Sequence, residues 1–563
     1  LIIQNYYPKE VFKNDPIYST YLIFDLGELM HGYPSMEIEG KAGTIIEFLY
    51  APNLLRGKFP LRTDISGRPL TDRIVLSEGK STWEALEMKY ARYLFIAVRN
   101  TDQPVKLHFT GMKRADYPFE PKGMLTVSTD KEVEWLWKAA TNTLRAITTD
   151  AFTDNYRERL QYAQTSYYAA RSSYAAFGDR FLQKRYLQQI SQEQQGDGVL
   201  PAAVPVTGYR GGRFLDASLF WVLGLHDYFL HSGDTQTVKD LLPVAKKVID
   251  RFQLWENKEG IIDTPPYPYW IDHAAIDRYG ANFSFNALYI LTLQDMKSIS
   301  EWLGNHDDAK EYERRAEKLR VFMREKFWDP QQLLFSDTWS EGKRSLTFTE
   351  QSNSLAIVAG IATKDQQSAI VKEFIDNKSS RLVPAVLFMH YLAESLFMSG
   401  YEKQALTLLK ERYRHMNTDG DSSTLWEEWA LTVSRRSGHL RPESNRTVSQ
   451  AEQTFLTYTL SRWLLGIQPT KPGMKEIVIS CHVGGLPEVK GDMPTPLGNV
   501  SVNWTDRGKG KHLEVIIPKG IRAFVDPSGK DLISKKVTID GKAVNNKGRK
   551  IQIPEGKHLL IFN

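Results

Sequence analysis

Two short segments, far apart in the sequence, carry the residue types that cleave glycosidic bonds. Such cleavage uses a pair of carboxyl groups, and aromatic rings can stack on the apolar face of the sugar. The first segment, 153–160, places acidic residues among arginines just before a predicted helix, and the second, 421–429, places them between two tryptophans. The acidic residues are Asp154 and Glu158 in the first segment, and Glu427 and Glu428 in the second.

Both segments also have a structural interpretation. An acidic junction that is rich in arginine is often the salt-bridged start of a helix. The run Trp426-Glu-Glu-Trp429 could equally form an ordinary amphipathic turn. Spacing alone leaves both interpretations open.

Other chemistries have less support. The sequence has no glycine-rich phosphate loop between a strand and a helix, no HExxH motif and no GxSxG motif. Its twelve histidines are scattered without ligand spacing. The single cysteine, Cys481, excludes an internal disulfide and a cysteine-based zinc site. We therefore expect no metal and no cofactor.

Composition indicates a globular chain of several domains. Its 563 residues are 42% hydrophobic and 25% charged, and at about 100–200 residues each they would form about three to five domains. The formal charge of +5 is too small for a nucleic-acid binder. No apolar run approaches the about 18 residues that a membrane-spanning helix needs. The basic stretch 519–557 is interpreted as solvated strand edges.

The order of local patterns predicts three structural units. Short alternating segments separated by Gly and Pro predict an antiparallel β-sandwich over 1–117, followed by a linker over 118–130. The hydrophobic period then becomes helical, and nearly every segment over 131–467 is predicted to be a helix. Strands return near the end, which predicts a second antiparallel β-sandwich over 468–563.

The helical unit is expected to hold about twelve helices in a double ring, six inside and six outside, as an (α/α)6 barrel. Thr129 and Glu132 are expected to form a capping box, with one helix over 165–190 and a short helix near Trp426. A helical-repeat solenoid is the alternative, although the sequence shows no fixed repeat. The aromatic loop 261–273 favours a pocketed barrel, because loops on rigid scaffolds carry function.

Six stretches resemble the α-L-rhamnosidases of glycoside hydrolase family 78, and together they cover nearly the whole chain. Residues 154–160 are similar to the family's Asp-Cys-Pro-Gln-Arg-Asp-Glu-Arg-Leu with one residue deleted. No single stretch is decisive, but six in the right order are. The stretches are Phe24–Gly27 with Gly40–Thr44, Asp154–Leu160, Gly196–Pro201, Tyr269–Asp272, Thr424–Glu427, and Leu464–Pro469 with Pro472–Ile477.

The resemblance implies roles for particular residues. Glu158 takes the place of the family's general acid and Glu427 that of its general base. The family inverts the anomeric centre, so the two carboxyls should lie roughly 6.5–9.5 Å apart, across a pocket at one end of the barrel. Trp270 should line this pocket, unless it anchors its loop to the core. The expected substrate-binding residues are Asp154, Arg157, Asp216, Trp270, Asp272, Trp426 and Gln450.

The chain also departs from the family pattern. Thr165 replaces a carboxylate of the sugar subsite, and Gln450 stands where the family has a histidine. Arg157 and Arg159 flank Glu158, and a close guanidinium would lower the pKa of a carboxyl that must hold its proton. The assignment therefore requires both arginines to point away or to pair with other carboxylates.

We expect an inverting exo-glycosidase that acts on a terminal α-linked L-rhamnose, or a similar deoxysugar, of a polysaccharide or glycoside. Two alternatives stay open: a glycosidase on the same scaffold with another sugar specificity, and a carbohydrate-binding protein that has lost catalysis. The expected partner is a rhamnose-containing carbohydrate, with neither nucleic acid nor membrane. Because no signal-peptide pattern precedes Leu1, we expect a processed or truncated product that is exported, periplasmic or on a bacterial cell surface.

Overall fold

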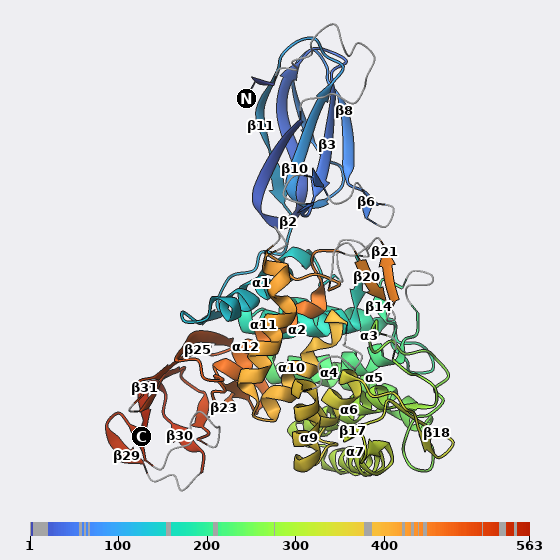
Figure 1. Ribbon diagram of the computed structural model, residues 1–563, viewed down its shortest axis with the longest axis vertical. Helices are drawn as coiled ribbons and strands as arrows, with labels where there is room; N and C mark the ends of the chain where they lie inside the picture. Colours follow the sequence, from blue (N-terminus) through green and yellow to red (C-terminus); the bar gives the residue numbers. More distant parts are fainter. Residues whose placement is uncertain are drawn as a thin grey trace.

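The computed structural model describes most of the chain (Figure 1). In this view the N-terminal strands stand above a helical body, and the C-terminal strands lie beside its lower part. The described residues are 2–3, 21–55, 59–60, 64–65, 68–153, 159–206, 212–274, 276–376, 385–418, 423–429, 433–436, 439–442, 447–508, 510–527, 536–544 and 549–563.

An antiparallel sheet forms the N-terminal part, with the order β1-β11-β2-β10-β3-β8 and with β9 also paired to β2. The 20-residue strand β2 organises this sheet, because it pairs with β10 near its start and with β11 and β9 further along. The strands are β1 (Ile2–Ile3), β2 (Tyr21–Gly40), β3 (Ile45–Ala51), β8 (Thr71–Val75), β9 (Gly79–Glu84), β10 (Lys89–Arg99) and β11 (Val105–Arg114), with short hairpins β4 (Leu54–Leu55) to β5 (Phe59–Pro60) and β6 (Asp64–Ile65) to β7 (Arg68–Pro69).

Twelve α-helices lie in the described part of the chain, and the even-numbered ones close a ring. Each of them contacts the next even-numbered helix, and α12 returns to α2. The odd-numbered helices pack against this ring. The helices are α1 (Lys131–Ile147), α2 (Ala163–Ala176), α3 (Phe181–Gln192), α4 (Leu215–Ser232), α5 (Thr235–Gln253), α6 (Phe283–Trp302), α7 (His306–Phe327), α8 (Glu350–Val358), α9 (Lys364–Asp376), α10 (Met389–Met398), α11 (Glu402–Thr418) and α12 (Phe455–Leu464).

Burial distinguishes the helices of the ring from those around it. α4 is buried on almost every side, whereas α7 buries only one face and is rich in charged residues. None of the helices in the described ranges is long and apolar enough to cross a membrane. Short elements connect the helices: β13 (Gln161–Tyr162), β14 (Ala203–Val204), β15 (Ala281–Asn282), β16 (Trp328–Asp329), β17 (Leu334–Phe335), β18 (Thr338–Ser340), β19 (Lys343–Arg344), β20 (Val433–Arg436), β21 (His439–Pro442), and the 3₁₀ turns Val386–Phe388 and Ala451–Thr454.

Helix α1 is capped one residue later than predicted. Its N-cap is Asp130, whose carboxylate accepts a hydrogen bond from the Val133 N–H at 3.2 Å. The expected capping box of Thr129 and Glu132 is therefore wrong. Glu132 pairs instead with Arg414 of α11, at 2.6 Å, because α11 lies alongside α1.

The helix predicted over 165–190 is two helices, α2 and α3. Gly178 adopts a left-handed conformation with φ of 64°, and its N–H donates to the Ser173 carbonyl at 2.9 Å. This geometry commonly ends a helix at a glycine. A side chain at this position would lie 2.8 Å from Pro494, so the glycine also makes room for the C-terminal sheet.

The short helix predicted near Trp426 is wrong. Residues 423–429 form bends without regular secondary structure, because hydrogen bonding to residues 447–450 outweighs the local preference for a helical turn. Two backbone hydrogen bonds, each of 3.1 Å, join the segments: the Glu427 N–H donates to the Thr447 carbonyl, and the Gln450 N–H donates to the Leu425 carbonyl.

Two sheets form the C-terminal part, and one of them takes a strand from the predicted linker. The larger sheet has the order β12-β24-β25-β26-β31-β28-β29, and the smaller has the order β22-β23-β27-β30. In the smaller sheet β23 pairs parallel with β27, so the prediction of a purely antiparallel unit is wrong in this respect. β12 pairs antiparallel with β24, so residues 118–130 do more than connect two units. The strands are β12 (Met124–Thr126), β22 (Ile467–Pro469), β23 (Glu476–Ile479), β24 (Glu488–Thr495), β25 (Gly498–Asp506), β26 (Lys511–Ile517), β27 (Arg522–Val525), β28 (Val537–Ile539), β29 (Lys542–Val544), β30 (Ile551–Ile553) and β31 (Gly556–Phe562), with a 3₁₀ turn at Pro472–Met474.

Candidate functional site

The predicted site residues that the structure describes gather at one end of the ring, where the even-numbered helices begin. Asp216 lies in the first turn of α4, the loop with Trp270 and Asp272 precedes α6, and Gln450 precedes α12. Backbone hydrogen bonds of 3.0 Å join the start of one ring helix to the segment before the next. They run from the Ala163 N–H to the Ala202 carbonyl and from the Leu215 N–H to the Pro268 carbonyl.

One part of the predicted site falls outside the described residues, namely Asp154, Arg157 and Glu158. Their positions, and the separation of the two predicted catalytic carboxyls, therefore stay predictions. The structure does describe Arg159, whose Nη2 donates to the Met88 carbonyl at 3.0 Å. One of the two arginines that flank the predicted acid thus has a partner before β10, in the N-terminal part.

The carboxylate of Glu427 is buried and oriented by Thr447. Only 2% of Glu427 is exposed. Its Oε2 accepts hydrogen bonds from the Thr447 N–H at 2.9 Å and from the Thr447 hydroxyl at 3.3 Å. The same hydroxyl lies 2.6 Å from the Ser449 carbonyl. A carboxylate fixed in this way can hold a constant direction toward a reacting water. Glu428, the next residue, is also buried, so burial alone does not distinguish the two glutamates.

The start of β10 connects the N-terminal sheet to both predicted catalytic segments. Tyr90 is fully buried, and its hydroxyl shares a hydrogen bond with the Ser449 hydroxyl. Burial raises the pKa of Tyr90, and the charge of Glu427 adds to the increase, so this carboxylate lies near the phenol. Two residues earlier, the Met88 carbonyl accepts from Arg159. Sequence reasoning missed this arrangement, because no local pattern relates residues 359 positions apart.

Asp216 holds the aromatic loop. Its two carboxylate oxygens accept the N–H groups of Trp270 at 2.9 Å and Ile271 at 2.8 Å. Ile271 has a φ of 61°, which is costly for a β-branched residue. Burial raises the pKa of Asp216, while the two N–H donors oppose that rise. Asp216 thus fixes the backbone of the loop, and its direct contact with a sugar stays a prediction.

The ring of Trp270 is only half-buried. It lies edge-on to Phe214, with centroids 6.0 Å apart, and to His273, with centroids 4.5 Å apart. Arg278 Nη2 donates to the Trp270 carbonyl at 2.7 Å and closes the loop from the other side. The indole is therefore held in a defined position without being enclosed in the core, and stacking on a sugar stays a prediction.

Asp272 joins its own loop to helix α8 and to the segment at Ala385, at the same end of the ring. Its carboxylate accepts hydrogen bonds from Gln351 Nε2 at 2.7 Å, from the Ala385 N–H at 3.1 Å and from the His273 N–H at 2.6 Å. Only 2% of Asp272 is exposed. Burial raises the pKa of Asp272 to about 6, and these three donors act against the rise.

Two other predicted substrate-binding residues are buried. Trp426 packs in the hydrophobic core, edge-on to His415 of α11. The Gln450 side chain donates to the Glu452 carboxylate. These contacts support the segments that carry Glu427, and substrate contact by either residue stays a prediction.

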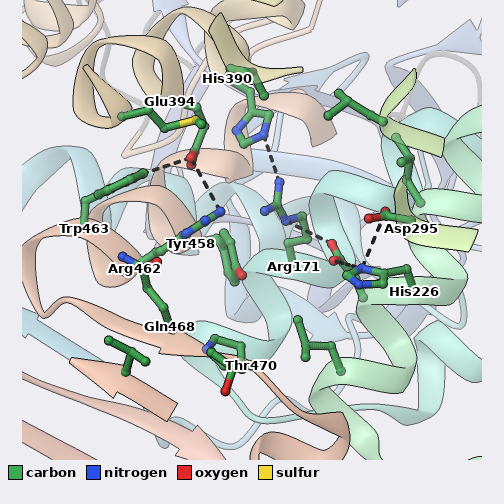
Figure 2. Close-up of a pocket in the computed structure, with 18 of the residues that line it drawn as sticks. Arg171, His226, Asp295, His390, Glu394, Tyr458, Arg462, Trp463, Gln468 and Thr470 are labelled. Atoms are coloured by element: carbon green, nitrogen blue, oxygen red, sulfur yellow. Dashed lines mark hydrogen bonds and ion pairs between the residues drawn. The ribbon is translucent and has the colours of Figure 1, made fainter. Parts of the chain in front are cut away.

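A cavity of about 670 Å³ lies at the other end of the ring and was not predicted (Figure 2). Its polar lining includes Arg171, Asp227 and Glu394. The signal that could have found it is an ionisable residue in the middle of an apolar helix, as in α4 and α10. In the part of the chain that the structure describes, no group of three His, Cys, Asp or Glu side chains could hold a metal ion.

Similarity to known proteins extends over most of the chain. An α-L-rhamnosidase from Alteromonas sp. (strain LOR) is 24% identical over 536 residues, which are 90% of this chain and 56% of that protein. The crystal structure of a GH78 family rhamnosidase from Bacillus sp. GL1 matches 90% of this chain and 53% of its own, with 22% identity and a TM-score of 0.81. An α-L-rhamnosidase from Streptomyces avermitilis, complexed with L-rhamnose, matches 97% of this chain and 53% of its own, with 18% identity and a TM-score of 0.77.

This chain thus spans about half the length of these relatives, and the likeness of the structures concerns the fold. Two family models match consecutive parts of the sequence. The bacterial α-L-rhamnosidase C-terminal domain matches residues 466–538. The bacterial α-L-rhamnosidase 6 hairpin glycosidase domain matches residues 122–449, which is more than half of the chain. The protein therefore belongs to the bacterial α-L-rhamnosidases, glycoside hydrolase family 78.

Proposed function

We propose that the chain is an exo-acting glycoside hydrolase that releases terminal α-L-rhamnosyl groups, or a similar deoxysugar, from a polysaccharide or glycoside. The observation that carries this proposal is the Glu427 carboxylate, which is buried and oriented by Thr447. It lies at the end of the ring where the loop with Trp270 leads into α6. Membership of the family supports the class of sugar.

The proposed reaction is a single displacement with two proton transfers. Glu427 takes a proton from a water molecule as the water oxygen attacks the anomeric carbon. Glu158 gives its proton to the glycosidic oxygen, which leaves with the bonding electrons. The water attacks from the face opposite the leaving group, so the configuration inverts, and the two carboxyls stand roughly 6.5–9.5 Å apart.

The architecture in this proposal is an (α/α)6 barrel over 131–467, between β-rich units over 1–117 and 468–563. The closed ring of even-numbered helices supports the barrel. The segment 118–130 connects the first unit to the barrel and contains β12, which pairs with β24 of the last unit.

An aryl α-L-rhamnoside followed by proton NMR tests the function and the mechanism together. We expect release of the aryl alcohol and the β-anomer of rhamnose as the first product. Early α-anomer would contradict inversion. Release of another sugar from a matched panel of aryl glycosides, with no release of rhamnose, would favour the alternative specificity. Binding without release in every case would indicate a carbohydrate-binding protein.

A further inference from the structure

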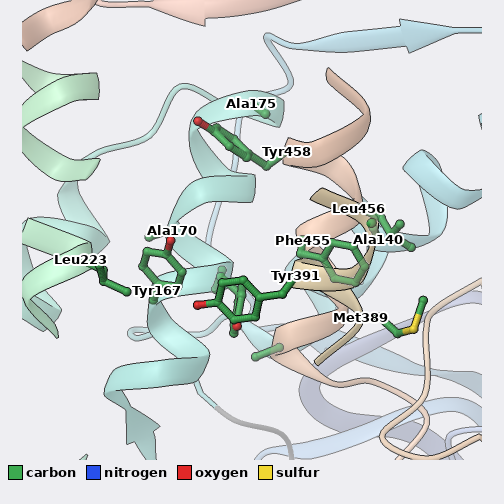
Figure 3. Packing of buried hydrophobic residues seen from close by; sticks show 14 of the residues in the cluster. Ala140, Tyr167, Ala170, Ala175, Leu223, Met389, Tyr391, Phe455, Leu456 and Tyr458 are labelled. Atoms are coloured by element: carbon green, nitrogen blue, oxygen red, sulfur yellow. The ribbon is translucent and has the colours of Figure 1, made fainter. Parts of the chain in front are cut away.

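The cavity at the far end of the ring is lined by all six even-numbered helices and by the C-terminal strands (Figure 2). Along α4, Asp216 belongs to the candidate site and Asp227 to the cavity lining. Eleven residues of helix separate them, which is about 16 Å along the axis. Tyr167, Tyr391 and Tyr458, which belong to the buried cluster (Figure 3), also line the cavity. The cavity is therefore a separate place in the fold.

Arg171 of α2 organises the inner part of the cavity. Its Nε lies 3.1 Å from the Asp227 carboxylate, its Nη1 donates to His390 Nε2 at 2.8 Å, and its guanidinium lies over the Tyr458 ring at 4.3 Å. Because an arginine only donates, His390 must accept at Nε2 and carry its proton on Nδ1. That buried Nδ1 has no hydrogen-bond partner among the described residues.

Glu394 and Arg462 form a second charged pair, nearer the mouth. The Glu394 carboxylate accepts from Trp463 Nε1 at 3.0 Å and lies 3.6 Å from the Arg462 guanidinium. In the part of the chain that the structure describes, the Arg462 guanidinium makes this ion pair but donates no hydrogen bond, and 29% of the side chain is exposed. The cavity thus offers unused donors beside aromatic faces.

The charges of the lining do not favour an ion of either sign. The described lining has three arginine or lysine side chains, Arg171, Arg462 and Lys550, and four carboxyls. His226 also lines the cavity and pairs with Asp227 and Asp295; burial lowers its pKa, but these two carboxyls raise it above the ordinary value. One of these carboxyls is Asp295, whose pKa is raised to about 7 by burial. A ligand's hydroxyl groups both donate and accept hydrogen bonds, so they can pair with the cationic donors and the carboxylate acceptors of this lining. The tyrosine and tryptophan rings can pack against the C–H faces of a sugar. The volume is within the about 300–1,000 Å³ of small-molecule sites.

We propose that this cavity binds a neutral, polyhydroxylated ligand, a monosaccharide or short oligosaccharide, between the ring and the C-terminal strands. The ligand's hydroxyl groups would complete the hydrogen bonds of Arg462 and of His390 Nδ1. This inference does not depend on the proposed hydrolysis, because none of the residues that carry it belongs to the candidate catalytic site.

Calorimetric titration of the intact chain tests the proposal, with L-rhamnose, D-galactose and inorganic phosphate as probes. Arg462→Met removes the donors and keeps an aliphatic chain, and we expect it to weaken sugar binding by at least about tenfold, because hydrogen bonds from a charged group are lost. Met398→Trp narrows the cavity mouth at a side chain that is 41% exposed. This variant should also weaken sugar binding by at least about tenfold. If Arg462→Met fails to fold, Met398→Trp tests the cavity in its place.

The matched control is Lys297→Met. Lys297 lies on α6, two residues after Asp295, but pairs with Glu313 of α7 outside the ring, so this variant should bind sugar as the unchanged chain does. Trp270→Ala separates the two sites: it should leave binding in the cavity intact. Sugar binding lost in Trp270→Ala but kept in both cavity variants would overturn the cavity proposal and leave the proposed function standing.

Two further results also decide the matter. Binding of phosphate without binding of either sugar would overturn the neutral ligand, as would the absence of any saturable sugar binding. Sugar binding that depends on Arg462, in a chain that hydrolyses no rhamnoside, would support the cavity and count against the proposed function. The two proposals therefore fail separately.

Discussion

At the scale of residues, the buried carboxylates of the candidate site differ in the groups that hold them. Asp216 accepts backbone N–H groups at both oxygens, and Asp272 accepts N–H donors from α8, from Ala385 and from its own loop. These contacts fix the shape of loops. Glu427 Oε2 accepts both the N–H and the hydroxyl of Thr447, a residue of the neighbouring segment. This arrangement orients the carboxylate, as a general base requires.

Replacing Glu427 by Gln should lower kcat by about 10²-fold or more, because general base catalysis is lost. All rhamnosides should be affected alike, since each needs an activated water. Glu158→Gln should instead harm substrates with poor leaving groups most, since an activated aryl group departs with little protonation. Steady-state kinetics on an aryl rhamnoside and on a natural glycoside would measure both effects.

Two controls accompany these variants. Glu193→Gln alters an exposed carboxylate and should leave kcat unchanged on both substrates. Glu428 is buried next to Glu427, so Glu428→Gln is the sharper comparison. If Glu428→Gln lowered kcat more than Glu427→Gln, the base would be Glu428.

Asp272 should make the stability of the protein depend on pH between about 4 and 6. Its carboxyl holds a proton up to about pH 6 when folded but loses it near pH 3.8 when unfolded. Between these values the folded state binds more protons, so the free energy of unfolding falls as pH rises, by about 3 kcal/mol at most. Urea unfolding at several pH values should show this slope reduced in Asp272→Asn. The exposed Asp240→Asn should keep the slope, and an unchanged slope in Asp272→Asn would contradict the assignment.

At the scale of elements, β10 links the N-terminal sheet to the segments on both sides of the site. Tyr90 bonds to Ser449 beside the Glu427 segment, and the residue before β10 bonds to Arg159 after the Glu158 segment. The N-terminal sheet thus acts as a brace for loops that belong to the helical part, and its contribution to turnover can be separated from its contribution to stability.

Tyr90→Phe should lower kcat by about tenfold, because the Ser449 segment loses its brace and small displacements of catalytic groups are costly. KM should change little. Tyr50→Phe is the matched control: Tyr50 is equally buried, on β3, and its hydroxyl donates to Asp72 within the N-terminal sheet, at 2.8 Å. Both variants should lose about 1 kcal/mol of stability. Equal kcat in the two variants would contradict the role of β10.

The sequence predicted the elements that have a strong period and missed those that depend on distant partners. Ring helices such as α4 are apolar on almost every side and outer helices such as α7 have one apolar face, so both kinds are readable in isolation. The break at Gly178, in contrast, needs knowledge of Pro494 packed against it. The bends at 423–429 form because that segment pairs with 447–450. The roles of Glu158 and Glu427 came from the resemblance to a family, and nothing local indicated the contact between Tyr90 and Ser449.

At the scale of the whole molecule, β12 ties the start of the helical part to the C-terminal sheet. Its pairing with β24 is close, because Gly491 lies directly against the β12 backbone. A Cβ added at Gly491 would stand 2.1 Å from the Met124 carbonyl oxygen. Units that lie far apart along the chain therefore share one sheet, and their stabilities should be coupled.

Gly491→Ala should destabilise the protein by about 1–3 kcal/mol, the usual cost of overpacking, and lower the melting temperature measured by scanning calorimetry. Gly196→Ala is the control, because nothing lies within 4 Å of a Cβ at that position. Equal melting temperatures for the two variants would show that β12 is not held against β24 in solution.

The pairing of β12 with β24 also determines when the C-terminal sheet can fold during synthesis on the ribosome. Ser128, just after β12, bonds to Glu488 at the start of β24, 360 positions later. At about 5–20 residues per second, roughly 20–70 s of synthesis separate the two strands. During that time β12 has no partner, and the C-terminal sheet must close by reaching back across helices already formed. A product that ends before β24 would therefore carry an open strand edge and be prone to aggregate.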